Sequence, residues 1–205
     1  MPPSLNYENR LKKKGFKNIA GIDEAGRGPL AGPVVAAAVI LPEKFSLPGL
    51  DDSKKLSEDF REELYQRITS LAAVGIGVVE AAEIDRLNIF QATFKAMAQA
   101  VLQLPRKPDC LLVDGPHKIL ALELPQWSLV KGDGLSFSVA AASVVAKVTR
   151  DRIMRELAKT YPEYSFDENK GYGTKLHLEV IFTKGLTPHH RRSFCVKKQL
   201  TFFDV

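Results

Sequence analysis

The sequence predicts a single α/β domain built around a mixed β-sheet. Three short apolar segments come early in the chain, at residues 19–24, 34–41 and 72–80, and Gly, Pro or charged residues bound each of them. Two more apolar segments, at residues 109–115 and 126–133, alternate with stretches whose apolar residues recur at helical spacing. Because strands that alternate with amphipathic helices form layered structures, we expect helices to flank a five-stranded sheet.

Caps and periodicity predict three helices in this domain. Ser57 is a typical N-cap residue followed by two acids, so we expect a helix from there through about Ser70. Helical spacing predicts a second helix over residues 81–104, which the following prolines end. The longest helix is expected over residues 136–160, which is Ala-rich in its first half and mixed in charge in its second. The basic N-terminal segment is expected to be helical or loose.

Composition limits the kinds of protein that this chain can be. The 205 residues are 45% hydrophobic and 26% charged, which fits one globular core. No apolar run approaches the roughly 18 residues of a spanning helix, and the N-terminal residues do not resemble a signal peptide, so we expect a cytoplasmic protein. Only two cysteines occur, far apart, which argues against disulfides or a cysteine zinc site. The net charge of +5 favours a polyanionic partner.

The first predicted strand runs into a glycine-rich turn whose residues, G-R-G-P-L-A, satisfy the loose pattern of a dinucleotide-binding loop. That interpretation fails because the turn leads into prolines and a β-branched run, where such a loop must open a helix. Asp23 and Glu24 would also repel a pyrophosphate. A phosphate-binding loop of the Walker type is excluded because no Lys-Ser or Lys-Thr follows the glycines.

Carboxylates follow three of the apolar segments. Asp23 and Glu24 end the first, Asp114 lies at the end of the fourth, and Asp133 ends the fifth, so we expect four carboxylates at strand ends. Unpaired carboxylates that converge at neighbouring strand ends repel each other, so they require cations. Two Mg²⁺ or Mn²⁺ ions held by shared carboxylates are a recurrent device for phosphodiester hydrolysis. A simple turn role remains open for Asp114, because Asp-Gly is a common turn dipeptide.

Several blocks of the sequence resemble, in order, the signature of bacterial ribonuclease HII. They are GIDEAGRGPLAGPVVAAAVIL, LDDSKKLS, EIDRLNI, DCLLVDG, VKGD, AAASVVAKVTRD, KGYGT and HHRRSF, from about Ile19 to Phe194. The resemblance implies a ribonuclease H-like fold over residues 18–194 with a helical C-terminal part, between a basic arm (1–17) and a tail (195–205). It implies Mn²⁺- or Mg²⁺-dependent cleavage of RNA in RNA/DNA hybrids, and incision of duplex DNA 5′ of an embedded ribonucleotide. The products carry a 3′-hydroxyl and a 5′-phosphate, and the activity serves replication and repair.

The resemblance also implies roles for individual residues. The metal-binding, catalytic acids are Asp23, Glu24, Asp114 and Asp133, with Asp151 a less favoured competitor for the fourth place. Ribonucleotide recognition falls to the glycine-rich turn, through Gly26, Arg27 and Gly28, together with Tyr172 of KGYGT. Ser53, Lys54 and Lys55 are implied to contact phosphates. Alternatively, they form a solvated cap just before the helix that follows. Tyr172 could otherwise be an ordinary loop anchor.

The C-terminal residues lead to two further predictions, one for contact with nucleic acid and one for a protein partner. A stripe of cations is expected to contact the nucleic-acid backbone: His189, His190, Arg191, Arg192, Lys197 and Lys198. The tail QLTFF resembles a short peptide by which bacterial repair proteins dock on the sliding clamp, through Gln199, Leu200, Phe202 and Phe203. Alternatively, its apolar residues cover the domain surface. We expect a monomer. Ribonuclease HIII is the nearest alternative, but only about 18 residues precede the first strand, too few for its usual extra N-terminal domain.

Overall fold

A computed structural model describes residues 2–195 of the chain. In chain order its elements are α1 (Asn6–Lys12), β1 (Ile19–Ala25), β2 (Val34–Ile40), η1 (Ser53–Lys55), α2 (Glu58–Leu71), β3 (Ala73–Val79), α3 (Ala81–Leu87), α4 (Ile89–Leu102), β4 (Cys110–Asp114), β5 (Gln126–Leu129), η2 (Gly132–Gly134), α5 (Phe137–Thr160), η3 (Pro162–Tyr164), α6 (Phe166–Asn169) and α7 (Lys175–Lys184). No helix among these residues has the length and apolarity needed to cross a bilayer.

The five strands form one mixed sheet, as the sequence predicts, in the order β3-β2-β1-β4-β5. β1 pairs with β2 as an antiparallel hairpin across the glycine-rich turn, which is incompatible with a dinucleotide-binding loop. β1 pairs with β4 in parallel, with Ile22 opposite Val113, and β4 pairs with β5 in parallel. The central strand β1 therefore lies between an antiparallel and a parallel neighbour, and its C-terminal end lies beside that of β4.

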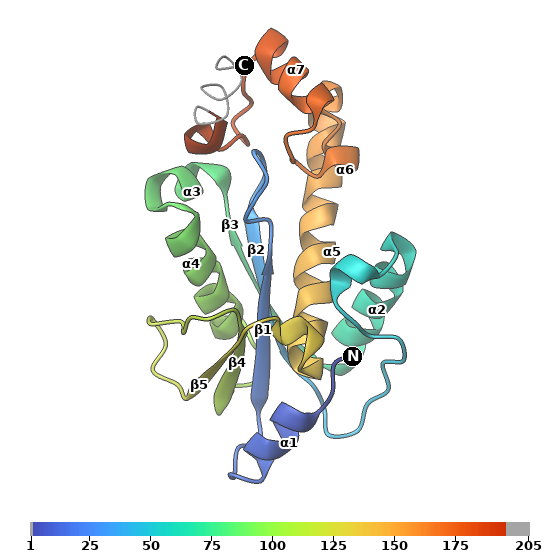
Figure 1. Cartoon of the computed structure of the whole chain (residues 1–205), viewed down its shortest axis with the longest axis vertical. Coiled ribbons are helices and arrows are strands. Elements are labelled where there is room, and N and C mark those ends of the chain that lie inside the picture. The colour runs from blue at the N-terminus through green and yellow to red at the C-terminus, as the bar shows by residue number, and fades with distance from the viewer. Residues whose placement is uncertain (1, 196–205) are drawn as a thin grey trace.

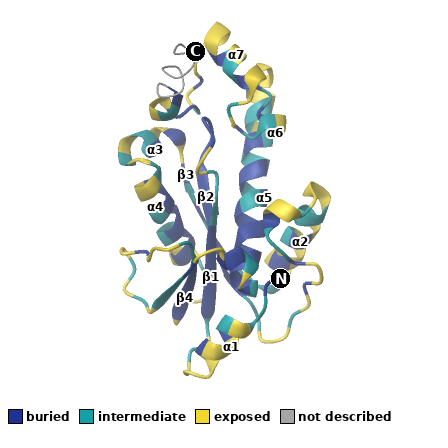
Figure 2. Cartoon of the chain, viewed as in Figure 1, coloured by how far each residue is buried: buried dark blue, intermediate teal, exposed yellow. Residues whose placement is uncertain are grey.

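Helices cover both faces of the sheet, and a helical extension continues beyond it (Figure 1). Because strand side chains alternate in direction, Ala36 and Ala38 of β2 pack with the α4 residues, whereas Ala37 and Val39 pack with α2 and α5. Figure 2 shows the resulting buried centre of the sheet and the buried side of α5. The α6 and α7 helices pack around a separate apolar cluster at the far end of α5 that includes Phe166.

Helix boundaries agree with the predicted caps, with one exception. The side chains of Ser57 and Ser136 accept hydrogen bonds at the starts of α2 and α5. The single helix expected over residues 81–104 is wrong, because the chain breaks at Asn88 into α3 and α4. Asn88 has φ 71° and its side chain accepts a hydrogen bond from the Gln91 amide, so it ends one helix and caps the next.

Helix α5 packs directly against the backbone of β1 at Gly21. A Cβ atom on Gly21 would lie 2.1 Å from the carbonyl carbon of Ser138 and 2.3 Å from the Val139 nitrogen. Both are backbone atoms that no rotamer change can move. Only glycine therefore allows the helix to approach the strand this closely.

Substituting Gly21 with alanine is expected to destabilise the protein by about 3 kcal/mol, because the added methyl group must push α5 away from β1. The measurement is the free energy of unfolding from urea titration. Gly134→Ala is the matched control, because a Cβ there meets nothing within 4 Å. Equal stability of the two variants would show that the Gly21 contact imposes no constraint.

Candidate active site

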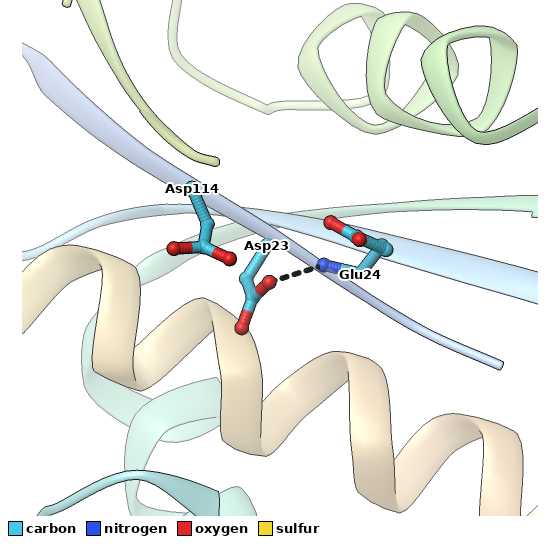
Figure 3. A group of neighbouring side chains, drawn as sticks. All are labelled: Asp23, Glu24 and Asp114. Carbon is cyan, nitrogen blue, oxygen red and sulfur yellow. Dashed lines mark hydrogen bonds between the residues drawn. The ribbon is translucent and has the colours of Figure 1, made fainter. Parts of the chain in front are cut away.

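Three carboxylates converge where β1 and β4 run side by side. Asp23 and Glu24 lie in β1, and Asp114 is the last residue of β4, one position beyond the Ile22–Val113 pair. Asp23, Glu24 and Asp114 each place a carboxylate oxygen within 4.8 Å of the others (Figure 3). We call these three residues the acidic cluster. Parallel pairing of two strands that both end in acids is what brings it together.

Adjacent acids in β1 reach opposite faces of the strand. Asp23 points toward α5 and accepts a hydrogen bond from the Ser143 hydroxyl, whereas Glu24 lines a cavity bounded by α4 residues. The Glu24 amide donates to Asp23 Oδ1 over 2.7 Å. The two carboxylates thus lie on opposite faces of the strand, one toward α5 and one toward the cavity beside α4.

Burial and nearby carboxylates favour the protonated forms of Asp23 and Glu24 when no cation is near. Burial, and then the charges of Glu24 and Asp114, hold the pKa of Asp23 well above its ordinary value. Burial also raises the pKa of Glu24, although Arg27, whose Nη1 lies 3.2 Å from Glu24 Oε1, opposes the rise. The site therefore concentrates negative charge that nearby side chains only partly balance.

Asp133 lies beside the acidic cluster and is not one of its three members. β5 ends at Leu129, so Asp133 sits in the η2 turn, and the prediction that it occupies a strand end is wrong. The turn is tied to the cluster by the Gly132 amide, which donates to Asp114 Oδ1 over 2.6 Å. Burial, followed by the charges of Asp52 and Asp114, raises the pKa of Asp133.

The η1 loop presents a lysine to the same acids. Burial lowers the pKa of Lys54, but the charges of Asp52, Asp133, Asp23 and Asp114 outweigh that effect and raise it. Lys55 instead pairs with Asp51 over 2.9 Å. Ser53 is only 3% exposed, and its hydroxyl lies 2.9 Å from that of Ser143. The Ser53 side chain therefore packs against Ser143 of α5, and its predicted contact with phosphate stays a prediction.

The glycine turn, residues 26–32, is held from behind by a buried arginine. The Arg191 guanidinium is fully buried and donates to four carbonyl oxygens, those of Gly26, Arg27, Pro29 and Gly32, over 2.6–3.0 Å. Burial and the neighbouring Arg150 lower the pKa of Arg191 to about 9, which leaves it charged at pH 7. These carbonyl groups all point inward, so Arg191 fixes the backbone of the turn.

A second buried arginine, Arg150 of α5, completes this support. It donates to the carbonyl oxygens of Ala31 and Pro33 over 3.1 and 3.0 Å. Gly26 has φ 96°, and a Cβ there would lie 2.1 Å from Arg150 Nε, so both the conformation and the close approach require glycine.

Tyr172 stands over the glycine turn with half of its surface exposed. A Cβ on Gly28 would lie 3.5 Å from the Tyr172 ring, so the ring and the turn are neighbours. The preceding residue, Gly171, accepts hydrogen bonds from the Leu30 and Ala31 amides through its carbonyl oxygen. Arg27 extends from the same turn with its side chain 54% exposed.

A cavity of about 140 Å³ opens on the Glu24 side of the acidic cluster. Its walls are the acids Glu24 and Asp114, Arg27, and a largely apolar surface formed by Phe90, Thr93, Phe94, Met97, Gly115, Pro116 and His117. The His117 ring packs edge-on against Phe90, with 5.3 Å between ring centroids.

Comparison with known proteins assigns this arrangement to a family. The model of the ribonuclease HII family matches residues 20–197. The chain belongs to the ribonuclease HII family. A ribonuclease HII of Bacillus cytotoxicus is 56% identical over 95% of this chain and 74% of its own length. Membership of the ribonuclease HII family makes the chain a nuclease of the ribonuclease H class.

Two solved structures have the same fold. The ribonuclease H2 of Pyrococcus horikoshii OT3 is 28% identical, with a TM-score of 0.76 over 92% of this chain and 100% of that one. The ribonuclease HII of Archaeoglobus fulgidus, solved in complex with PCNA, is 28% identical, with a TM-score of 0.73 over 86% and 94% of the two chains. The predicted ribonuclease H-like fold is confirmed.

The prediction that a cationic stripe near the C-terminus contacts nucleic acid is wrong in part. His190 and Arg191 are buried and therefore cannot contact a nucleic-acid backbone. His189 packs against Tyr161, and Arg192 is exposed. Lys197 and Lys198 lie outside the described residues, as do Gln199, Leu200, Phe202 and Phe203 of the tail.

Sequence reasoning missed the supporting roles of three residues, Ser143, Arg150 and Arg191, the last of which it assigned to the cationic stripe. Ser143 and Arg150 are seven residues apart in α5, so they share the face that packs on β1, and polar residues on a buried face were an available signal. Asp151, the competitor for the fourth carboxylate, pairs with Lys147 over 2.7 Å in the same helix. No comparable signal marked Arg191, because its partners are carbonyl groups about 160 residues away.

Replacing Arg191 with lysine is expected to destabilise the protein by at least about 2 kcal/mol, because one ammonium group cannot satisfy four inward-pointing carbonyl groups. Thermal and urea unfolding measure the loss. Arg192→Lys, one residue away and exposed, should change the free energy of unfolding by less than about 0.5 kcal/mol. A small change in the free energy of unfolding of Arg191→Lys would show that the glycine turn keeps its conformation without the arginine.

Proposed function

We propose that the chain hydrolyses the RNA strand of RNA/DNA hybrids and incises duplex DNA 5′ of an embedded ribonucleotide, in support of ribonucleotide removal during replication and repair. The observation that carries this proposal is the juxtaposition of the acidic cluster with the glycine turn. The acidic cluster suits a phosphodiester held by cations. The glycine turn suits a sugar that the protein must contact at close range.

The acidic cluster fits a divalent-cation site. Its donors are carboxylate oxygens, which Mg²⁺ and Mn²⁺ prefer. Burial, together with neighbouring carboxylates, raises the pKa of Asp23 and of Glu24, and a bound cation would offset this cost of charging them. We propose that Asp23, Glu24, Asp114 and Asp133 hold two such ions. When bound, two divalent ions supply a nucleophilic water near neutral pH and neutralise charge on the leaving oxygen, so that the products carry a 3′-hydroxyl and a 5′-phosphate.

The chain's own residues supply substrate positioning. Arg191 and Arg150 draw carbonyl groups of the glycine turn inward, which leaves Gly26, Arg27 and Gly28 to face the ribose through their outer side. Tyr172, exposed beside Gly28, packs on the following deoxyribose. Lys54, which faces the acids, and Lys55 contact phosphates of the duplex.

A DNA duplex with one embedded ribonucleotide tests the proposal, with Asp133 and Asp151 as the discriminating positions. In Mg²⁺ or Mn²⁺, the wild-type protein should cut 5′ of the ribonucleotide, and Asp133→Asn should reduce turnover by at least on the order of 100-fold. Asp151→Asn should retain activity within about tenfold, because Asp151 pairs with Lys147 on α5. Initial rates at saturating substrate are the measurement.

Absence of a cut by the wild-type protein would refute the proposed function. Full activity of Asp133→Asn with an inactive, folded Asp151→Asn would transfer the fourth carboxylate role to Asp151. Circular dichroism on both variants separates lost chemistry from lost structure.

Arg27→Ala should weaken selection of the ribonucleotide while leaving cation binding intact. The side chain is half exposed and contacts the cluster through a single ion pair with Glu24, so its loss removes a group proposed to face the ribose and leaves all four carboxylates in place. We expect about a tenfold lower kcat/KM at the single ribonucleotide, and Mn²⁺ affinity by calorimetry within about threefold of wild type. Arg10→Ala, also exposed, is the control. Loss of Mn²⁺ affinity would contradict this separation of roles.

The ribonuclease HIII alternative has less support. Curated relatives 54–58% identical over 95% of this chain are ribonucleases HII. The binding of the tail to a sliding clamp stays a prediction from its sequence. The ribonuclease HII of Archaeoglobus fulgidus was solved in complex with PCNA.

A further inference from the structure

Two buried histidines lie beneath Tyr172, away from the acidic cluster. His177 of α7 and His190 are fully or almost fully buried, and their Nε2 atoms are 3.0 Å apart. His177 Nδ1 lies 2.8 Å from the Tyr172 carbonyl oxygen. His190 Nδ1 lies 3.0 Å from the Thr187 amide nitrogen and 2.9 Å from the Thr187 hydroxyl. The pair thus links two backbone segments through side chains alone.

The groups at the two ends of this chain of hydrogen bonds determine where the protons lie. The Thr187 amide can only donate, so His190 Nδ1 accepts and, in a neutral ring, Nε2 carries the proton. The Tyr172 carbonyl can only accept, so His177 Nδ1 carries a proton and its Nε2 accepts. The proton between the rings therefore belongs to His190 Nε2. Both rings are neutral and of opposite tautomers, and every bond runs in one direction from Thr187 to Tyr172.

The surroundings keep the pair uncharged. Burial, followed by His177, lowers the pKa of His190 to about 4, with His189 adding to the decrease. The rings of Tyr164 and Phe166 pack against both imidazoles. Tyr164 is titratable, but its hydroxyl donates to the Gly185 carbonyl oxygen and is engaged away from the pair.

The pair fixes the loop of Tyr172 against the glycine turn. Gly171 accepts hydrogen bonds from Leu30 and Ala31, and Ala31 forms a β-bridge with His190. The turn therefore contacts the Tyr172 loop on one side and the His190 segment on the other, while the two imidazoles join these segments to each other. The three backbone segments form a closed ring of contacts.

We propose that His177 and His190 act as a neutral hydrogen-bond relay whose function is to position Tyr172, and that this relay sets the preference for a ribonucleotide followed by deoxyribonucleotides. The inference rests on the proposed role of Tyr172 in that selection. The two histidines are positioning residues: the substrate contact belongs to Tyr172, and the relay holds the Tyr172 backbone at a fixed distance from Gly28.

Nitrogen-15 NMR of the imidazole rings in the wild-type protein tests the relay directly. At pH 7 we expect the ring of His177 to be protonated only at Nδ1 and that of His190 only at Nε2, each assigned by the loss of its signals in His177→Gln or His190→Gln. The same tautomer in both rings, or a charged ring at pH 7, would overturn the relay whatever the enzyme's activity.

Two substitutions of His177 separate its two bonds. Asparagine places an amide near Nδ1 and can still donate to Tyr172, whereas glutamine reaches the Nε2 position, keeps the contact with His190 and loses the bond to Tyr172. Each variant breaks one link of the relay, so for the single-ribonucleotide duplex we expect both to raise KM about 3- to 10-fold with kcat within about twofold. His177→Gln should also lower the ratio of kcat/KM for that duplex over a uniform RNA/DNA hybrid.

The controls separate this inference from the proposed function. Glu179→Gln, on α7 but exposed and outside the relay, should leave both KM and the ratio unchanged. A fall in kcat as large as the rise in KM would indicate a merely structural role, and no loss in either His177 variant would show that Tyr172 is held by other contacts. Either result overturns the inference. Failure of the wild-type protein to cut the ribonucleotide duplex would refute the proposed function, and the NMR result would still decide whether the relay exists.

Discussion

The close packing of α5 along β1 is the constraint on which the rest of the site depends. Gly21 lets the helix backbone approach the strand, and from that point the two elements run together. Two residues farther along β1, Asp23 meets Ser143, and three residues after that, Gly26 meets Arg150. A single helix thus supports a carboxylate and the turn that follows it. Any shift of α5 along β1 would disturb both at once.

The alternation of side chains in β1 explains why adjacent acids are useful there. Asp23 faces α5, where Ser143 and Ser53 form a chain of hydroxyl groups behind it. Glu24 faces the cavity beside α4 and pairs with Arg27. Two adjacent residues of β1 therefore provide one buried carboxylate and one that borders the cavity. Two acids separated by one residue would instead face the same side of the strand.

Much of the fold follows from local patterns in the sequence. The five strands and the caps Ser57 and Ser136 follow from apolar runs and hydrogen-bonding side chains, which act over a few residues. The break at Asn88 was missed because apolar spacing continues through it, while the left-handed backbone depends on one side chain that can cap a new helix. The spacing of apolar residues indicates which face of a helix is buried, but it does not indicate where the backbone becomes left-handed and the helix ends.

The acidic cluster could be predicted in part. Asp23, Glu24 and Asp114 follow strands that pair directly, so their convergence is a consequence of topology. The position of Asp133 depends on a turn anchored by the Gly132 amide, and the burial of Arg191 depends on carbonyl groups distant in sequence. Charged residues are usually exposed, so composition pointed Arg191 and His190 toward solvent. Their tertiary hydrogen bonds reverse that expectation.

The distance in sequence between the glycine turn and Arg191 has a consequence for the order in which the molecule is completed. A chain emerging during synthesis contains the whole acidic cluster once residue 114 has been made, but the guanidinium that holds Gly26 and Gly32 arrives more than 70 residues later. Until then, the carbonyl groups of the turn have no partner from that arginine. The three acids are thus present well before the arginine that fixes the backbone of the turn. A truncated chain would retain these acids without the arginine that shapes the turn.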